Sequence, residues 1–366
     1  MRVPVVDTRG VAQMPCTPGK ARHLFKSGKA RPKWNKLGLF SVQLCYEQEP
    51  DNQLLVVGID PGSKFEGFSV VGAKDTVVNL MVEAPDHVQD AVETRRTMRR
   101  ARRFRKWRRP KRFRNRLNRK KRIPPSTRSR WEAKARIVTH LATILPITDV
   151  VVEDVQAVTR KGAKGGRWDR AFSPVQVGKE HLYQLLCSMG LTLHLREGWQ
   201  TKELREKYGL KKTKSKSKQS FDSHTVDSWV MAASVSRAVQ PSCTHLWYVV
   251  PARLHRRQLH RLQAAKGGER TPYGGTRSLG LKKGTLIHHP KYGHCTVGGF
   301  DRKKQTISLH AYRTNKRLTQ GAKVKDCCVL TWVSFRAFLV TQEQKKGGGV
   351  SSHSLKAGGS LRRDVS

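Results

Sequence analysis

Residues 54–84 read LLVVGIDPGSKFEGFSVVGAKDTVVNLMVEA and contain three apolar runs separated by short turns. The first run, LLVVGID, ends in the carboxylate of Asp60 and is followed by a Pro-Gly turn. FEGFSVVG and TVVNLMVEA are two further runs of strand length. A parallel βαβ unit needs a long crossover between its strands, whereas antiparallel neighbours can be joined by a few residues. The sequence therefore predicts an antiparallel meander here.

Downstream of residue 122 the pattern alternates between helix and strand. The predicted elements are, in order, a helix WEAKARIVTHLATIL, a strand ITDVVVED, a helix from Phe172 to Met189, a strand LTLHL, a short helix TKELREKYGL, a flexible basic loop KKTKSKSKQS, a helix FDSHTVDSWVMAASVSRAV and a strand HLWYVV. With the meander in front, this order resembles an RNase H-like α/β domain that carries an arginine-rich insertion.

The two ends of the chain predict smaller units. Near the start, the strands Val3–Val6 and 39–44 flank a short basic helix with Thr17 as N-cap and Pro18 at its first position. After residue 283, the runs TLIHH, CTVGGF, TISLHAY and CCVLTWVSF predict a small β-barrel or sandwich. The glycine- and serine-rich residues 342–366 predict a disordered tail.

The charge of the chain points to a polyanionic partner. The 366 residues include 73 Lys and Arg against 27 Asp and Glu, a formal net charge of +46. Long nucleic acid is the usual partner of such a chain, because each neutralised phosphate releases condensed counterions. A membrane surface is the weaker alternative, since no apolar stretch approaches ~20 residues and no lipidation motif appears. The start, MRVPVVDTRG, has no apolar signal core, and none of the seven cysteines forms a C-x-x-C pair. We therefore expect a protein of the prokaryotic cytosol, not of a membrane.

The most basic segment runs from Arg95 to Arg122, where 18 of 28 residues are Lys or Arg and none is acidic. A helix starting after Asp86 is predicted, with Pro110 kinking or ending it. Like charges four residues apart destabilise such a helix in water, so we expect phosphates around it. A disordered basic tail or a localisation signal is the alternative. The residues expected to contact RNA are Arg95, Arg96, Arg99, Arg100, Arg102, Arg103, Arg105, Lys106, Arg108 and Arg109.

Three carboxylates form a candidate metal site. Asp60 and Glu153 each end an apolar strand, and Asp227 lies in a predicted helix one turn after His224. Carboxylates at the ends of adjacent strands repel one another and need cations. Two Mg²⁺ ions, with Mn²⁺ able to substitute, would activate water for phosphodiester hydrolysis, and His224 could position or deprotonate that water. Asp154 is expected on the opposite face of its strand.

Several motifs resemble one known family. GIDPGSKFEGFSVV, VVVED and SHTVDSW resemble, in order, the three split nuclease motifs of RuvC-like domains. MPCTPGKARHLFKSGKARP resembles the PLMP domain of the transposon-encoded IscB family, relatives of the CRISPR type II effectors. The arginine-rich run resembles their bridge helix, and KGG followed by PYGGT resembles their C-terminal region. The PLMP tetrapeptide itself reads Ala12-Gln13-Met14-Pro15.

IscB proteins carry an HNH nuclease between the second and third RuvC motifs. Here only residues 155–221 separate those motifs, so the chain resembles IsrB, the member of this family without HNH. The resemblance implies a metal-dependent nickase that uses a guide ωRNA to bind double-stranded DNA beside a target-adjacent motif and cuts the non-target strand. It assigns Asp60, Glu153, His224 and Asp227 to the nuclease centre, and we expect a monomeric protein in the ribonucleoprotein.

The expected layout follows the same resemblance, as an α/β RuvC nuclease core split by a bridge helix. Its parts are a PLMP domain (1–52), RuvC part I (53–90), the bridge helix (91–122), RuvC parts II and III (123–252), a β-rich domain that contacts the target-adjacent motif (253–341) and the tail (342–366). Two alternatives remain open: a protein-guided RNase H-like resolvase or transposase, and a non-catalytic binder of structured RNA.

Overall fold

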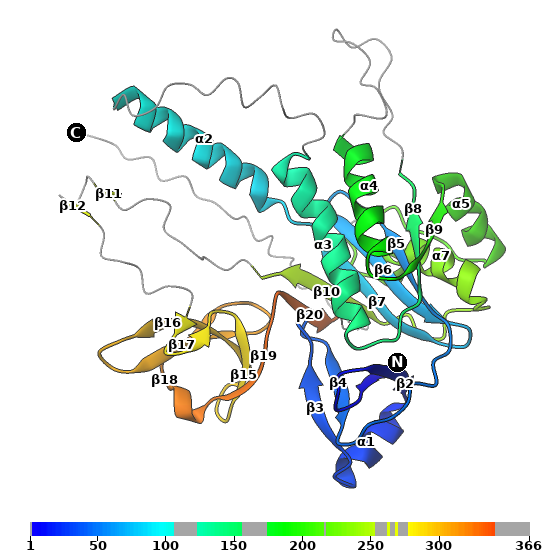
Figure 1. The fold of residues 1–366 in the computed structure, drawn as a ribbon, viewed down its shortest axis with the longest axis horizontal. Helices are drawn as coiled ribbons and strands as arrows, with labels where there is room; N and C mark the ends of the chain where they lie inside the picture. The colour runs from blue at the N-terminus through cyan, green and yellow to red at the C-terminus, as the bar shows by residue number, and fades with distance from the viewer. Residues whose placement is uncertain are drawn as a thin grey trace, which may run out of the picture.

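The computed structural model describes residues 2–105, 123–155, 174–215, 217–252, 262–263, 268–269 and 277–340. In these ranges the protein is a mixed α/β structure with three main β-sheets (Figure 1). The expected tail (342–366), the second half of the arginine-rich segment and most of residues 253–276 lie outside the described residues. None of the described helices is long and apolar enough to cross a membrane.

The first sheet has four strands in the order β2-β1-β4-β3 and is packed on one helix. Its elements are β1 (Val3–Val6), β2 (Ala12–Cys16), α1 (Pro18–Lys26), β3 (Ala30–Trp34) and β4 (Phe40–Leu44). The Thr17 side chain accepts a hydrogen bond from the backbone N–H of Lys20 at 3.3 Å, which confirms the predicted N-cap. Strands β2 and β3 were not predicted, because their polar and proline residues break the apolar alternation.

The central sheet has seven strands in the order β20-β10-β7-β6-β5-β8-β9. Its strands are β5 (Leu55–Asp60), β6 (Phe65–Gly72), β7 (Thr76–Glu83), β8 (Asp149–Glu153), β9 (Thr192–Arg196), β10 (Leu246–Pro251) and β20 (Phe335–Leu339). Strands β5, β6 and β7 pair antiparallel, which confirms the predicted meander. Strand β8 runs parallel to β5, and β9 runs parallel to β8. This arrangement is consistent with an RNase H-like core.

Helices cover both faces of this sheet. The described helices are α2 (His87–Arg105), α3 (Pro125–Ala142), α4 (Pro174–Cys187), α5 (Gly198–Lys207), α6 (Phe221–His224) and α7 (Val226–Ser236), of which α3 and α4 lie on one face and α7 on the other. On one face Val57 and Ile59 of β5 pack in a core with residues of α3 and α4. On the other face Val56 packs in a core with residues of α7. Because both faces are buried, β5 reads as a continuous apolar run.

The helix predicted over residues 221–239 is two helices in the structure. Helix α6 ends at His224, and α7 starts at Val226. Thr225 between them has φ −127° and ψ −2°, which is not a helical conformation. The prediction that one continuous helix carries both His224 and Asp227 is therefore wrong. The break lets the start of α7 turn onto the sheet, where Ser69 of β6 donates a hydrogen bond to the carbonyl of Thr225 at 3.3 Å.

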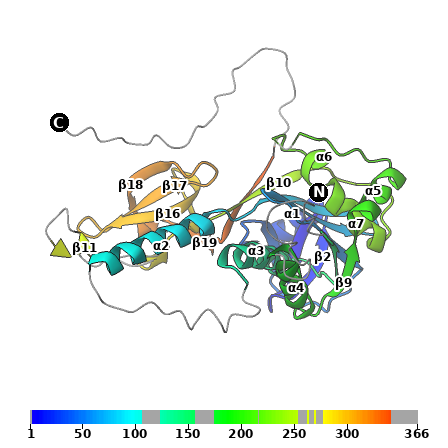
Figure 2. The same ribbon diagram turned by 90° about the horizontal axis from the view of Figure 1, so that it is seen from above.

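The third sheet is a small C-terminal unit with five strands in the order β18-β17-β16-β15-β19. Its elements are β15 (Thr285–His289), β16 (Gly293–Asp301), β17 (Thr306–Ala311), β18 (Arg317–Lys323), the 3₁₀ turn η4 (Val324–Asp326) and β19 (Cys328–Trp332). Two short pairs, β11 (Leu262–Gln263) with β12 (Gly268–Glu269) and β13 (Arg277–Ser278) with β14 (Leu281–Lys282), precede it. In Figure 1 this unit lies well apart from α2, although the two overlap when the protein is seen from above in Figure 2.

The chain returns from the C-terminal unit to the central sheet. The predicted run CCVLTWVSF is split between β19, in the C-terminal sheet, and β20, which pairs antiparallel with β10. Where the chain leaves β10 and where it comes back, the N–H of Ala252 donates to the carbonyl of Ser334 at 2.9 Å. The residues between these two points are thus an insertion between neighbouring strands.

Candidate active site

The three predicted carboxylates meet at one edge of the central sheet. Ile59 pairs with Val152 across the parallel strands β5 and β8, so Asp60 and Glu153 follow at the same level. Successive side chains of a strand point to opposite faces. Val56 and Val151 pack against α7, and Asp60 and Glu153 therefore lie on the α7 face as well. Asp227 occupies the first turn of α7.

Two glycines allow α7 to lie directly on the sheet. A Cβ at Gly58 of β5 would stand 1.8 Å from the carbonyl oxygen of Ser228, the residue after Asp227. A Cβ at Gly67 of β6 would stand 2.1 Å from the carbonyl oxygen of His224. A hydrogen bond of 2.9 Å joins the hydroxyls of Ser69 and Ser228 in the same contact. This close approach brings Asp227 to the ends of β5 and β8.

Burial and mutual repulsion disfavour the charged forms of the clustered carboxylates. Burial, and then the nearby charges of Asp60 and Asp227, raise the pKa of Glu153 to about 7. Burial also raises the pKa of Asp60 above its usual range, although the Lys212 ammonium opposes that shift. Glu153 therefore keeps its proton to a higher pH than an ordinary glutamate does.

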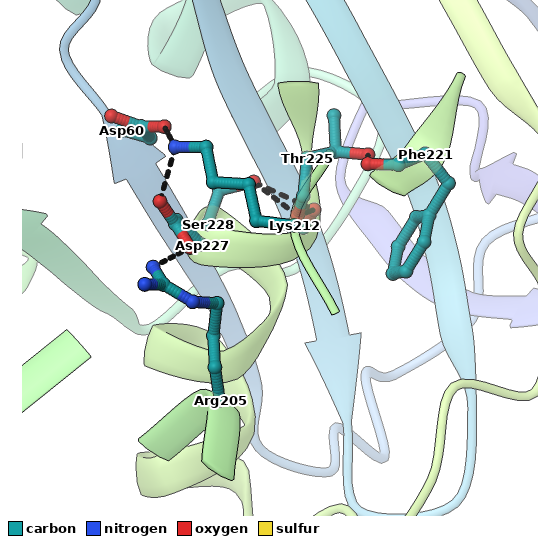
Figure 3. Close-up of polar contacts among 8 residues, drawn as sticks. Asp60, Arg205, Lys212, Phe221, Thr225, Asp227 and Ser228 are labelled. Atoms are coloured by element: carbon teal, nitrogen blue, oxygen red, sulfur yellow. Dashed lines mark hydrogen bonds and ion pairs between the residues drawn. The ribbon is translucent and has the colours of Figure 1, made fainter. Parts of the chain in front are cut away.

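Two basic side chains pair with these carboxylates (Figure 3). Arg205 of α5 donates to one oxygen of Asp227 at 2.5 Å. Lys212 follows α5, and its ammonium donates to the other oxygen of Asp227 and to Asp60, the latter at 3.4 Å. Burial lowers the pKa of Lys212, but Asp60 and Asp227 outweigh it and hold this pKa above the usual value. Neither residue was predicted from the sequence, because no periodicity or motif marks a basic residue beside a carboxylate that is distant in the chain.

His224 lies at the α6 end of the site. Its side chain is buried, and its ring packs edge-on against Phe65 with 5.2 Å between ring centroids. The order of the two helices places it three residues before Asp227, across the break at Thr225. Its ring thus lies beside the aromatic side chain at the start of β6.

Asp154 lies on the other face, as predicted. It accepts hydrogen bonds from the Lys179 ammonium at 2.5 Å and from the Tyr183 hydroxyl at 2.8 Å, both on α4. This carboxylate therefore ties α4 to the end of β8. Its contacts distinguish it from its neighbour Glu153.

The donor set suits a hard divalent cation, since Mg²⁺ and Mn²⁺ prefer carboxylate oxygens. Within the described ranges, however, no group of three or more His, Cys, Asp and Glu side chains is arranged as a ready set of metal ligands. In Figure 3 the Lys212 side chain reaches between Asp60 and Asp227. The residues fit the metal by their chemistry, provided that this ammonium moves.

The arginine-rich segment is partly described. Helix α2 includes the first arginines of the run, and Arg95, Arg96, Arg99 and Arg100 are exposed on it. Arg102, Arg103 and Arg105 belong to its last turn and a half. Lys106, Arg108 and Arg109 lie outside the described residues. In Figure 1 the helix extends from α3 away from the central sheet.

Comparisons with known proteins give limited matches. A family model described as "RRXRR protein" matches residues 3–167, and residues 99–103 of this chain read RRARR. Among solved structures the chain is similar to RuvC of T. thermophilus in complex with a Holliday junction substrate, at 16% identity and a TM-score of 0.28. That alignment covers 49% of this chain and 90% of the RuvC chain. No curated protein matches the sequence. The sequence is thus similar over residues 3–167 to the RRXRR protein family.

Proposed function

We propose that this protein is a metal-dependent, RNA-guided DNA endonuclease that nicks one strand of its target. The observation that carries the proposal is the convergence of Asp60, Glu153 and Asp227 from β5, β8 and α7 onto one edge of the sheet. The family model over residues 3–167, which is associated with nucleases of the IscB and RuvC kind, points in the same direction.

Asp60, Glu153 and Asp227 are the residues that would hold two Mg²⁺ ions, or Mn²⁺ in their place. When bound, such ions activate water and neutralise charge in phosphodiester hydrolysis. The chain's own contribution is to keep the three carboxylates together. Arg205 fixes one oxygen of Asp227, and the close contact at Gly58 fixes the position of α7. His224 is proposed to position or deprotonate the attacking water.

Guidance by RNA is proposed from the basic helix. Four exposed arginines lie in the first half of the run, in a chain with 73 basic and 27 acidic residues. A guide ωRNA would supply the missing phosphates. The β-rich part within residues 253–341 is proposed to contact the target-adjacent motif of a double-stranded DNA. In line with the resemblance to IsrB, one strand, the non-target strand, is proposed to be cut by a monomeric protein in a ribonucleoprotein.

The catalytic proposal is tested by nicking of a matched supercoiled plasmid in Mg²⁺ with the variants Asp60→Asn, Glu153→Gln and Asp227→Asn. Each should abolish nicking while the variant still binds the target. Glu206→Gln is the matched control, because that carboxylate is exposed on α5 and pairs only loosely with Lys202 at 3.8 Å. Full nicking by any of the three variants would remove that residue from the site.

The guide is tested separately by sequencing the RNA that survives purification. One defined transcript from the same locus is the expected result, and its removal should abolish target binding. Nicking that persists at branched DNA after complete removal of RNA would instead indicate a protein-guided resolvase. Bound RNA without any metal-dependent cleavage would indicate a structural RNA binder.

A further inference from the structure

Lys212 differs from every other basic residue described near the site, because it bonds two carboxylates from different elements. Its ammonium donates to Asp60 at the end of β5 and to Asp227 in the first turn of α7. The Asp227 side chain is only 5% exposed, whereas that of Lys212 is 38% exposed. The ammonium thus reaches inward to a buried carboxylate from a backbone at the surface.

Arg205 also contacts Asp227, but from a helix and through a single oxygen. It projects from within α5, which packs against α7, and its side chain is 23% exposed. It bonds only the oxygen of Asp227 that Lys212 does not use. Arg205 can therefore keep its contact with Asp227 while Lys212 leaves the other oxygen of Asp227 and the oxygen of Asp60.

The segment that carries Lys212 is tied down at one point. The backbone N–H of Thr213 donates to the carbonyl of Asp222 at 3.1 Å, and the hydroxyls of Thr213 and Ser223 lie 2.7 Å apart. Lys211 and Lys214 on either side are exposed. The side chain of Lys212 can thus rotate out to solvent while Thr213 keeps the backbone in place.

We propose that Lys212 is a resident counter-cation that competes with divalent metal for Asp60 and Asp227 and swings outward when metal binds. A metal ion bonds carboxylate oxygens at about 2.0–2.1 Å, which leaves no room for an ammonium on the same two oxygens. Without metal, Lys212 neutralises a pair of carboxylates that would otherwise repel each other. Once released, it stands with Lys211 and Lys214 at the mouth of the site, where it can pair with a phosphate of bound nucleic acid.

The competition part of this inference rests on the proposed metal site, and its test does not depend on cleavage. The full chain, as purified, is labelled with an amine-acylating reagent with and without Mg²⁺, and the labelling rate of each lysine is measured by mass spectrometry. Lys212 should be labelled slowly without Mg²⁺ and at least about tenfold faster with it, since it loses two charge-assisted bonds. Lys214 is the internal control, because it is exposed in both states and its rate should not change.

Metal affinity provides the second measurement. The variant Lys212→Gln should bind Mn²⁺ about tenfold more tightly than the wild type, because the competing cation is gone. Lys214→Gln removes the same charge from the same loop and should leave the Mn²⁺ affinity within about twofold of wild type.

The outcomes separate the two proposals. If the wild type binds Mn²⁺ and Asp60→Asn abolishes that binding, but Lys212 stays protected from labelling, the counter-cation inference is wrong and the metal site stands. Equal gains in affinity for Lys212→Gln and Lys214→Gln would also overturn it, because a general charge effect would then suffice. If Asp60→Asn and Asp227→Asn bind Mn²⁺ as the wild type does, the metal site itself is wrong.

Discussion

The contact between Gly58 and α7 makes a quantitative prediction about how the fold holds the site. In Gly58→Ala the new Cβ would stand 1.8 Å from the carbonyl oxygen of Ser228, a backbone atom that no side-chain rotation can move. An ordinary contact needs about 3.4 Å, so α7 must shift by about 1.6 Å (3.4 − 1.8). Overpacking of this kind costs about 1–3 kcal/mol of unfolding free energy. Because Asp227 precedes Ser228, the same shift moves Asp227 away from Asp60.

The assay separates the stability effect from the effect on the site. Urea unfolding gives the loss of stability, and Mn²⁺ affinity and nicking rate are then measured at a temperature where the variant is fully folded. A displacement of about 1 Å in a catalytic group costs about 100-fold in rate, so the folded variant should nick at least that much more slowly. Gly321→Ala in β18 is the control, since its Cβ would meet nothing closer than 4.0 Å. A Gly58→Ala protein with wild-type stability and wild-type nicking would refute the idea that this contact positions Asp227.

Three further predictions concern other parts of the molecule. Lys134→Met should cost about 3–5 kcal/mol of unfolding free energy in urea, because it leaves the buried Glu66, bonded at 2.6 Å, without its partner. The control Arg128→Gln breaks the exposed pair with Glu132 and should cost under about 1 kcal/mol. Equal losses of unfolding free energy in the two variants would contradict this prediction. Burial, with Lys36 and Arg136 nearby, lowers the pKa of His140 to about 4 from 6.5, so its contribution to stability is complete above pH 6.5 and is lost as the pH falls towards 4. The wild type should therefore lose more stability than His140→Gln between pH 7 and pH 4.5, and parallel pH curves would rule this out. Finally, replacing Arg95, Arg96, Arg99 and Arg100 together with Gln should flatten the salt dependence of RNA binding by about 0.7–0.9 in slope for each lost phosphate contact, and an unchanged slope would show that α2 does not contact the RNA backbone.

The elements that the sequence predicts well are those whose residues are buried on both sides or follow a simple period. Strands β5 and β8 are apolar runs that end in carboxylates, and both the runs and the meeting of Asp60 with Glu153 follow from the pattern. The edge strands β3 and β18 were missed because water covers much of them, which removes the need for apolar alternation. Strand β20 could not be assigned to the central sheet, because its partner β10 lies more than eighty residues earlier.

The residues of the candidate site also divide into those that the sequence predicts and those that it does not. The three carboxylates can be predicted because each sits at a strand end or in the first turn of a helix. Lys212 cannot, because it lies in a run of lysines whose described members are all exposed, and only the tertiary contacts with Asp60 and Asp227 distinguish it from its neighbours. The break at Thr225 was not predicted from the sequence, and it lies where the backbone packs directly on β6, since a Cβ at Gly67 would stand 2.1 Å from the carbonyl oxygen of His224.

The hydrogen bond between Ala252 and Ser334 also bears on how this protein can evolve. A module whose entrance and exit are neighbours can be shortened, lengthened or exchanged without changing the path of the strands that carry it. Two attachment points, unlike one, also prevent the module from rotating freely about a single tether. Its orientation is further fixed by the Tyr312 hydroxyl, which accepts the N–H of Ala337 in β20 at 3.1 Å. New binding preferences could therefore be acquired in the C-terminal unit while the geometry of Asp60, Glu153 and Asp227 is preserved, and a designer could graft a foreign β-domain at the same two residues.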